Sequence, residues 1–255
     1  LQVLVVLEDR VDVLRLVGDV VQAGPGVVHA EQHVVVDVLF AAVEPCRIDI
    51  VERGSGWPVP LVELRTTHGV RFVSDNAGIV AFDLPECLGR ETWLFVEGHG
   101  YGVPADGFGF RGVRVTPRSG GRLKIEVTRS NLARRLGRIT GGGIFGESQK
   151  LGLEPAWRES GVFGCDSVQA VEYHGRLFWM WGDTTLARYP LGVFHMTAAR
   201  TEVRPLQPQP IPPIRLNYEL FRDAEGQPRP VATMSGEGPT WLAGLIVDRK
   251  STRLN

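Results

Sequence analysis

Short alternating segments separated by turn-forming residues fill the middle of the chain and constrain its fold more than any other feature. Cys46–Glu52 alternates, with Ile48 and Ile50 on one face and Arg47 and Asp49 on the other. Clusters of glycine, asparagine and aspartate separate the segments that follow and favour tight turns. These segments are 59–66, 70–74, 79–82, 91–97, 110–116 and 123–128. About seven short strands at this spacing predict a β-sandwich over residues 46–129.

Composition supports a mainly β protein and excludes several classes of function. The 31 glycines and 17 prolines favour turn-rich architecture. A formal net charge of −1 leaves no field to attract nucleic acid, and no apolar run is long enough for a membrane span. The 3 cysteines argue against a disulfide-stapled scaffold and lack C-x-x-C spacing. We therefore expect no nucleic-acid partner, no metal and no cofactor.

Residues 1–44 differ in composition from the rest of the chain. They contain no Ser, Thr, Asn, Lys, Ile, Tyr, Trp or Met, and roughly a third of them are valine, far above ordinary usage. Two interpretations stay open: an irregular β or helical segment, or the translation of a wrong frame or strand of GC-rich DNA. The second explains the missing residue types better, so we expect this segment not to be native.

The end of the chain is also unusual. Residues 248–255 form a polar tail that breaks abruptly from the apolar segment 241–247. The tail resembles a translated sequencing adapter, so we expect it to be artefactual and the parent protein to continue beyond residue 247.

Two runs within residues 46–129 carry a family pattern. They read G-W-P-V-P-L-V-E-L-R (56–65) and G-V-R-F-V-S-D-N-A-G-I-V-A-F-D (69–83). This segment resembles the carboxypeptidase-regulatory, or transthyretin-like, sandwich family, and residues 75–82 are its most recognisable part. Gly78 serves a tight turn there. The resemblance implies an accessory spacer or a weak binding module, and no nucleophile, base and orienting residue are arranged for catalysis.

Residues 130–163 are predicted to be a linker. A short helix is expected over 131–136 with Ser130 as its cap, and the three glycines at 141–143 mark a domain junction. Further along, the proline-rich run 205–213 predicts an extended polyproline II connector.

The most informative stretch is G-C-D-S-V-Q-A-V-E-Y-H-G-R-L-F-W-M-W-G-D-T, residues 164–184. It predicts a hairpin with a strand at 168–171, a turn at 173–176 and an aromatic strand at 177–181. The hairpin resembles the first blade of five-bladed β-propellers related to glycoside hydrolases. Residues 164–247 then resemble an incomplete propeller, the first blade and part of the second, with further strands expected at 193–198, 236–242 and 244–247. The whole resembles an uncharacterised secreted bacterial family that joins such a sandwich to such a propeller.

The propeller resemblance implies a set of acids. Propeller glycosidases place carboxylates from several blades around one channel, where one acts as general acid and another as base or nucleophile. Asp166 resembles the family's first-blade base, and Asp183 and Glu237 are further candidate catalytic acids in turns. The alternative stays open that Asp166 and Asp183 accept backbone N–H bonds in turns.

Three further residues are candidates for substrate binding. Trp179 or Trp181 could stack on a sugar ring through its apolar face, although packing within the blade is the competing interpretation. His195 lies in an apolar segment that we expect to be a strand, where a buried, hydrogen-bonded histidine is the alternative to a ligand-binding one.

We therefore expect a fragment of a secreted carbohydrate-active or carbohydrate-binding protein, extracellular or periplasmic, whose partner is a polysaccharide or glycan. Because one blade and part of a second cannot close a ring, the chain itself is expected to be inactive as an enzyme. The alternative is a non-enzymatic extracellular binding or adhesion protein built of β domains. Substrate, linkage and oligomeric state are not predicted.

Overall fold

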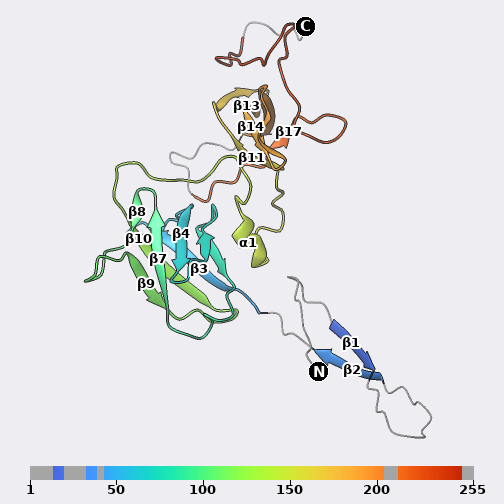
Figure 1. Cartoon of the computed structure of the whole chain (residues 1–255). Helices are drawn as coiled ribbons and strands as arrows, with labels where there is room; N and C mark the ends of the chain where they lie inside the picture. Colours follow the sequence, from blue (N-terminus) through green and yellow to red (C-terminus); the bar gives the residue numbers. More distant parts are fainter. Residues whose placement is uncertain (1–13, 20–32, 39–42, 204–211, 249–255) are drawn as a thin grey trace, which may run out of the picture. The chain divides into compact units, whose positions relative to one another are not determined.

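The computed structural model describes residues 14–19, 33–38, 43–203 and 212–248, and the chain divides into two units, Leu1–Glu44 and Pro45–Asn255 (Figure 1). In the first unit, β1 (Leu14–Asp19) pairs antiparallel with β2 (His33–Val38). The valine run at 34–36 is therefore in a strand. The expectation that residues 1–44 are not native stays a prediction.

The second unit begins with an eight-stranded sheet in the order β5-β4-β7-β8-β10-β3-β6, with β9 paired to β7. The strands are β3 (Cys46–Glu52), β4 (Val62–Thr66), β5 (Arg71–Val73), β6 (Ile79–Phe82), β7 (Thr92–Gly98), β8 (Tyr101–Gly102), β9 (Gly112–Val115) and β10 (Arg122–Arg129). Neighbours are antiparallel except β10 and β3, which are parallel. The end strands β5 and β6 lie in contact, so the sheet is nearly closed and barrel-like.

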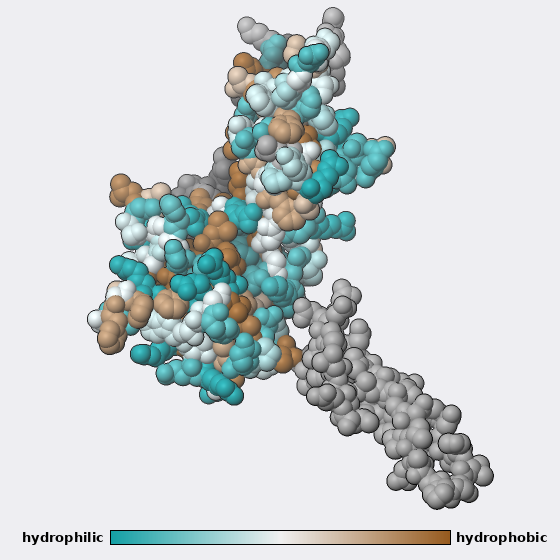
Figure 2. Space-filling model, in the orientation of Figure 1, coloured by the Kyte–Doolittle hydropathy of each residue, from teal (hydrophilic) through white to brown (hydrophobic). Residues whose placement is uncertain are grey.

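Alternation along the strands builds the core of this barrel-like sheet. Ile48 and Ile50 of β3 are both 0% exposed, as the sequence pattern predicts. Between them, Asp49 points to the other face, where Arg47 and Arg122 each bind its carboxylate at 2.6 Å. Polar side chains dominate the visible surface of the second unit, with scattered apolar patches (Figure 2). The prediction of a mainly β chain is confirmed. The strands form one continuous path in a single sheet, and the transthyretin-like sandwich stays a prediction.

The segment after the barrel-like sheet is irregular apart from the short helix α1 (Gly146–Lys150). The expected helix at 131–136 is wrong, because interactions with the barrel-like sheet hold this segment in an irregular conformation. Arg134 donates two hydrogen bonds to the buried carboxylate of Glu52, at 2.9 and 3.1 Å. The backbone N–H of Arg135 donates to the Tyr101 hydroxyl at 3.0 Å.

The turn between β5 and β6 ties the sheet to the segment around α1. The Asn76 side chain exchanges two hydrogen bonds with the backbone of Arg138, both 2.8 Å long. The Asp75 carboxylate is buried and accepts the backbone N–H of Ser148 at 2.7 Å and that of Ala77 at 2.9 Å. Burial raises the pKa of Asp75 above its ordinary value.

Two smaller antiparallel sheets follow, one in the order β11-β14-β15 and the other in the order β12-β13-β16-β17. The strands are β11 (Val162–Cys165), β12 (Gln169–Tyr173), β13 (Arg176–Trp181), β14 (Thr184–Leu186), β15 (Tyr189–Val193), β16 (Thr197–Glu202) and β17 (Glu219–Leu220). The expected hairpin is formed by β12 and β13, and Tyr173 pairs with Arg176 at its turn.

Other expected strands are wrong. The segment 193–198 spans the end of β15 and the start of β16, and the segments 236–242 and 244–247 contain no strand. Positive φ angles at Gly236 (131°) and Gly238 (96°) interrupt extended pairing in that region. Most of the predicted polyproline connector, 205–211, lies outside the described residues. None of the helices in the described part of the chain is long and apolar enough to cross a membrane.

Candidate functional site

An aromatic cluster forms on one face of β13. Because side chains alternate along a strand, Trp179 and Trp181 share a face, opposite to Phe178 and Met180. The two indole rings are stacked, with centroids 6.4 Å apart and an interplanar angle of 7°. Tyr218 packs edge-on against both rings, with centroids 5.6 Å from Trp179 and 5.1 Å from Trp181. This arrangement brings together residues far apart in the sequence.

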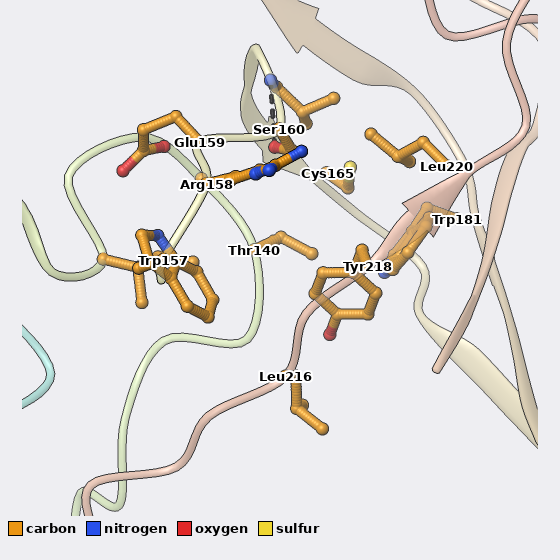
Figure 3. Close-up of a pocket in the computed structure, with 13 residues that line it drawn as sticks. Thr140, Trp157, Arg158, Glu159, Ser160, Cys165, Trp181, Leu216, Tyr218 and Leu220 are labelled. Atoms are coloured by element: carbon orange, nitrogen blue, oxygen red, sulfur yellow. Dashed lines mark hydrogen bonds between the residues drawn. The ribbon is translucent and has the colours of Figure 1, made fainter. Parts of the chain in front are cut away.

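Two adjoining hollows surround Tyr218, and we call them together the Tyr218 cleft. They share Arg158, Leu216 and Tyr218 as lining residues. The first is a narrow recess of about 20 Å³, whose lining includes Trp157, Cys165 and Trp181 (Figure 3). The second is an open hollow of about 360 Å³, lined also by Ala156, Arg176, Thr201, Glu202, Arg215, Asn217 and Glu219. The recess has room for about one water molecule, so a larger ligand would occupy the open hollow.

Four side-chain donors that line the Tyr218 cleft are buried without a hydrogen-bond partner among the described residues. They are Trp157 Nε1, Arg176 Nε, Trp181 Nε1 and the Tyr218 hydroxyl. Trp157 is 9% exposed and Trp181 is 1% exposed. Leaving such a group unsatisfied costs about 1–3 kcal/mol, and native proteins usually satisfy buried polar groups with protein, water or ligand atoms. The cluster therefore indicates a place for a water or a ligand that carries acceptor oxygens.

Charged groups around the open hollow are mostly paired. Arg176 and Arg200 each donate to the Glu219 carboxylate at 2.7 Å, and these hydrogen bonds lower the pKa of Glu219. Arg215 is paired with Glu154, a contact that raises the pKa of Arg215. Burial raises the pKa of Tyr218, and the nearby Cys165 adds to that shift. The Tyr218 hydroxyl is therefore neutral at physiological pH.

The structure brings two of the three candidate acids together. The Asp166 Oδ1 atom accepts the backbone N–H of Asp183 at 3.0 Å, and the backbones of the two residues are joined by an N–H to C=O bond of 3.3 Å. The buried Oδ1 of Asp183 has no hydrogen-bond partner in the described part of the chain. Glu237 is exposed in a separate turn and is not bonded to either aspartate. None of these acids lines the Tyr218 cleft, and Asp166 acts as a backbone acceptor in a turn.

The three candidate substrate-binding residues have different surroundings. Trp181 is a wall of the recess, and its ring is packed between Trp179 and Tyr218, so no sugar can stack on it without moving them. Trp179 is half-buried and donates from Nε1 to the Thr201 hydroxyl at 2.9 Å. His195 lies in the connection between β15 and β16, where its Nδ1 accepts the backbone N–H of Thr240 at 3.2 Å. His195 is outside the cleft.

Three residues that line the cleft were not among the predicted site residues: Tyr218, Arg158 and Trp157. The sequence does contain one indication of a shared face: Leu216, Tyr218 and Leu220 alternate with polar residues, and all three line the recess. No pattern along the chain indicated that Arg158 and Trp157, about a quarter of the chain earlier, would face them.

No group of three or more His, Cys, Asp or Glu side chains within the described ranges could hold a metal ion. The Cys165 thiol, which lines the recess, lies 3.7 Å from the Thr184 hydroxyl. Burial, with a smaller contribution from Asp166, raises the pKa of Cys165 to about 11. This thiol is therefore protonated and weakly nucleophilic at neutral pH.

Comparisons of this chain with protein-family models, with curated proteins and with solved structures give no match.

Proposed function

We propose that this chain binds carbohydrate in the Tyr218 cleft and does not hydrolyse it. The observation that carries this proposal is the position of four buried donors without acceptors beside an aromatic wall. Sugars present apolar C–H faces together with many oxygen acceptors, so they suit a cleft that combines aromatic surface with unsatisfied donors. A ring would lie in the open hollow against Tyr218, beside Arg176, while the Trp157 and Trp181 donors line the recess behind it.

The carboxylates of the cleft support binding without turnover. Glycoside hydrolysis uses two carboxyl groups on either side of the scissile bond. In the cleft, Glu219 is held by two arginines and Glu159 accepts the backbone N–H of Gly143 at 3.0 Å. Among the described lining residues, Glu202 therefore lacks a second unpaired carboxylate with which to form a catalytic pair. The proposal therefore includes no catalytic role for Asp166, Asp183 or Glu237.

The proposal extends to the architecture of the parent protein. The sheet β12-β13-β16-β17 has the four antiparallel strands of one propeller blade, although β14 and β15 interrupt the order along the chain. This sheet supports the assignment of residues 164–247 to an incomplete, glycoside-hydrolase-like propeller, with residues 46–129 as an accessory transthyretin-like sandwich. A secreted, extracellular or periplasmic protein is part of the same proposal and follows from the resemblance alone.

One observation favours the alternative, an adhesion protein that recognises another protein. The loop between β8 and β9 presents Phe108, 90% exposed, and Phe110, 54% exposed. Asp106 holds this loop in shape, because its Oδ1 accepts the backbone N–H of both phenylalanines at 2.9 Å. A rigid loop that exposes two phenylalanines is typical of a protein contact.

A glycan array followed by titration calorimetry tests the proposal. We expect binding to one class of oligosaccharide, at least about tenfold weaker in Tyr218→Ala because the aromatic wall is lost. Tyr189→Ala is the matched control, since Tyr189 is 59% exposed and does not line the cleft. Unchanged binding in Tyr218→Ala, or release of reducing sugar by the wild-type chain, would contradict the proposal.

The same array separates the two candidate functions. Phe108→Ala should leave glycan binding unchanged if the Tyr218 cleft is the site. If no glycan binds, and Phe108→Ala abolishes adhesion to a cell surface that the wild-type chain recognises, the adhesion alternative is the correct one.

A further inference from the structure

We infer that the Tyr218 cleft selects carbohydrates that carry a carboxylate, as uronic acids do. This inference rests on the proposal of carbohydrate binding and adds the chemical class of the ligand. The cleft has more hydrogen-bond donors without a partner than carboxylates without a partner, counted among its described lining residues.

Two of the three arginines that line the open hollow are held in place. Arg176 donates to Glu219 at 2.7 Å, and Arg215 donates from Nε to Glu154 at 3.0 Å. Glu219 accepts a further bond from Arg200. These ion pairs fix the wall of the hollow. Because each carboxylate is paired with an arginine, the negative charges of Glu154 and Glu219 are compensated and repel an anionic ligand only weakly. The Arg176 Nε atom remains buried without an acceptor.

Arg158 is different from both of these arginines. It lines the recess and the open hollow, it is exposed, and no hydrogen bond or ion pair connects it to another described residue. Figure 3 shows its side chain lying along the recess. A guanidinium group offers five N–H donors in a planar fork, a geometry that matches a carboxylate through two parallel hydrogen bonds. Arg158 is therefore the available anion-binding group of the cleft.

The remaining groups make the donor excess larger. The wall of the open hollow also contains two buried donors without a partner among the described residues, the Tyr218 hydroxyl and Arg176 Nε. On the acceptor side, Glu202 is the one carboxylate of the hollow that no cation binds within the described part of the chain. A neutral sugar hydroxyl offers two acceptor lone pairs together with one donor, and it carries no charge. A carboxylate brings two acceptor oxygens, no donor and a charge opposite to that of Arg158.

Titration calorimetry with paired ligands tests the inference. The probes are oligogalacturonate and oligoglucuronate, each as the free acid and as the uncharged methyl ester. We expect the free acid of one of them to bind at least about tenfold more tightly than its ester, the gain of a charge-assisted pair. Arg158→Gln should reduce this preference, measured as the ratio of the dissociation constants of ester and acid, to less than about twofold. Arg158→Lys, which keeps the charge but loses the fork, should retain part of the preference.

Arg188→Gln is the matched control, because Arg188 is an exposed arginine of the β14–β15 turn that does not line the cleft. Equal binding of acid and ester, or a preference that survives Arg158→Gln, would overturn the inference while leaving carbohydrate binding in place. Tighter binding of a sulfated oligosaccharide than of either uronate would replace the carboxylate class. Absence of binding to every glycan, neutral ones included, would overturn the proposed function and the inference together.

Discussion

The carboxylate of Asp166 accepts a hydrogen bond from the backbone N–H of Asp183, with Oδ1 3.0 Å from the nitrogen. The same oxygen occupies the space beside Gly182, where a Cβ atom would collide with it. Gly182 in turn donates its N–H to the Asp166 carbonyl at 3.0 Å. The propeller resemblance implies a catalytic base at Asp166. In the structure, its carboxylate and backbone connect the turn between β11 and β12 to the residues that follow β13.

These contacts predict that Asp166 and Gly182 are energetically coupled. Asp166→Ala should lower the free energy of unfolding by about 1 kcal/mol, because the Asp183 N–H loses its acceptor. Gly182→Ala should cost a similar amount by displacing the carboxylate, and the double variant should cost clearly less than the sum. Urea unfolding followed by tryptophan fluorescence measures all three. Asp166→Asn, which retains an acceptor oxygen, is the control; strictly additive costs would show that the two residues act separately.

Gly78 is predicted to tolerate no side chain. Its φ is +68°, and an added Cβ would lie 2.5 Å from the Ile50 carbonyl oxygen and 2.9 Å from the Pro58 Cβ. Gly78→Ala should destabilise the barrel-like sheet by about 3 kcal/mol or more, combining left-handed strain with overpacking. Gly54→Ala is the matched control, since Gly54 has φ +90° but no atom within 4 Å of the new Cβ. Thermal unfolding of both variants checks this, and equal losses would be the contrary result.

Asn76 is predicted to hold the segment around α1 on the barrel-like sheet. It is 1% exposed and makes two 2.8 Å bonds to the backbone of Arg138. Asn76→Ala should cost about 1–3 kcal/mol, because both hydrogen bonds to the half-buried Arg138 backbone are lost. Limited proteolysis should then cut within 137–146 much faster than in wild type. Asn217→Ala, at an exposed asparagine, should change neither measurement, and a protease-resistant Asn76→Ala would contradict the role.

The Cys165 thiol is predicted to react slowly at neutral pH. Burial raises its pKa to about 11, so its thiolate fraction increases only as the pH approaches that value. At pH 8, alkylation by iodoacetamide should be about 100-fold slower than that of a thiol with a pKa of about 9, because only the thiolate reacts. Peptide mass spectrometry of timed samples from pH 7 to 10 measures the rate at Cys165. A rate that bends near pH 9 and levels off toward pH 10, instead of rising about tenfold per pH unit throughout, would show a thiol with an ordinary pKa.

Local sequence signals predict some elements of the fold well. The expected bounds of 46–52 and 79–82 coincide with β3 and β6, because alternation and flanking turn residues act within a few positions. The β12–β13 hairpin follows for the same reason. The helix expected at 131–136 fails because Glu52, far away in the sequence, binds Arg134 more strongly than the weak local preference favours a helix.

The candidate site was only half visible in the sequence. The sequence offered Trp179 and Trp181 of the aromatic strand 177–181 as candidates for stacking on a sugar, and Trp181 lines the recess. Of the other cleft residues, Arg158 comes from the irregular segment before β11, and Tyr218 from the segment between β16 and β17. Their convergence depends on packing between distant segments, which leaves no periodic signal.

By itself, the sequence determined a mainly β chain, the positions of its best-defined strands and turns, and the aromatic face of β13, because each of these depends on residues within one strand or turn. Only the tertiary structure decided that the sheet nearly closes through the parallel pairing of β10 with β3 and the contact of β5 with β6. It also decided that Asp166 accepts a backbone N–H 17 residues away, while Tyr218 and Arg158 line a donor-rich cleft. Whether a polar side chain is free for a ligand depends on which backbone or side-chain group lies opposite it, and long-range packing sets that partner.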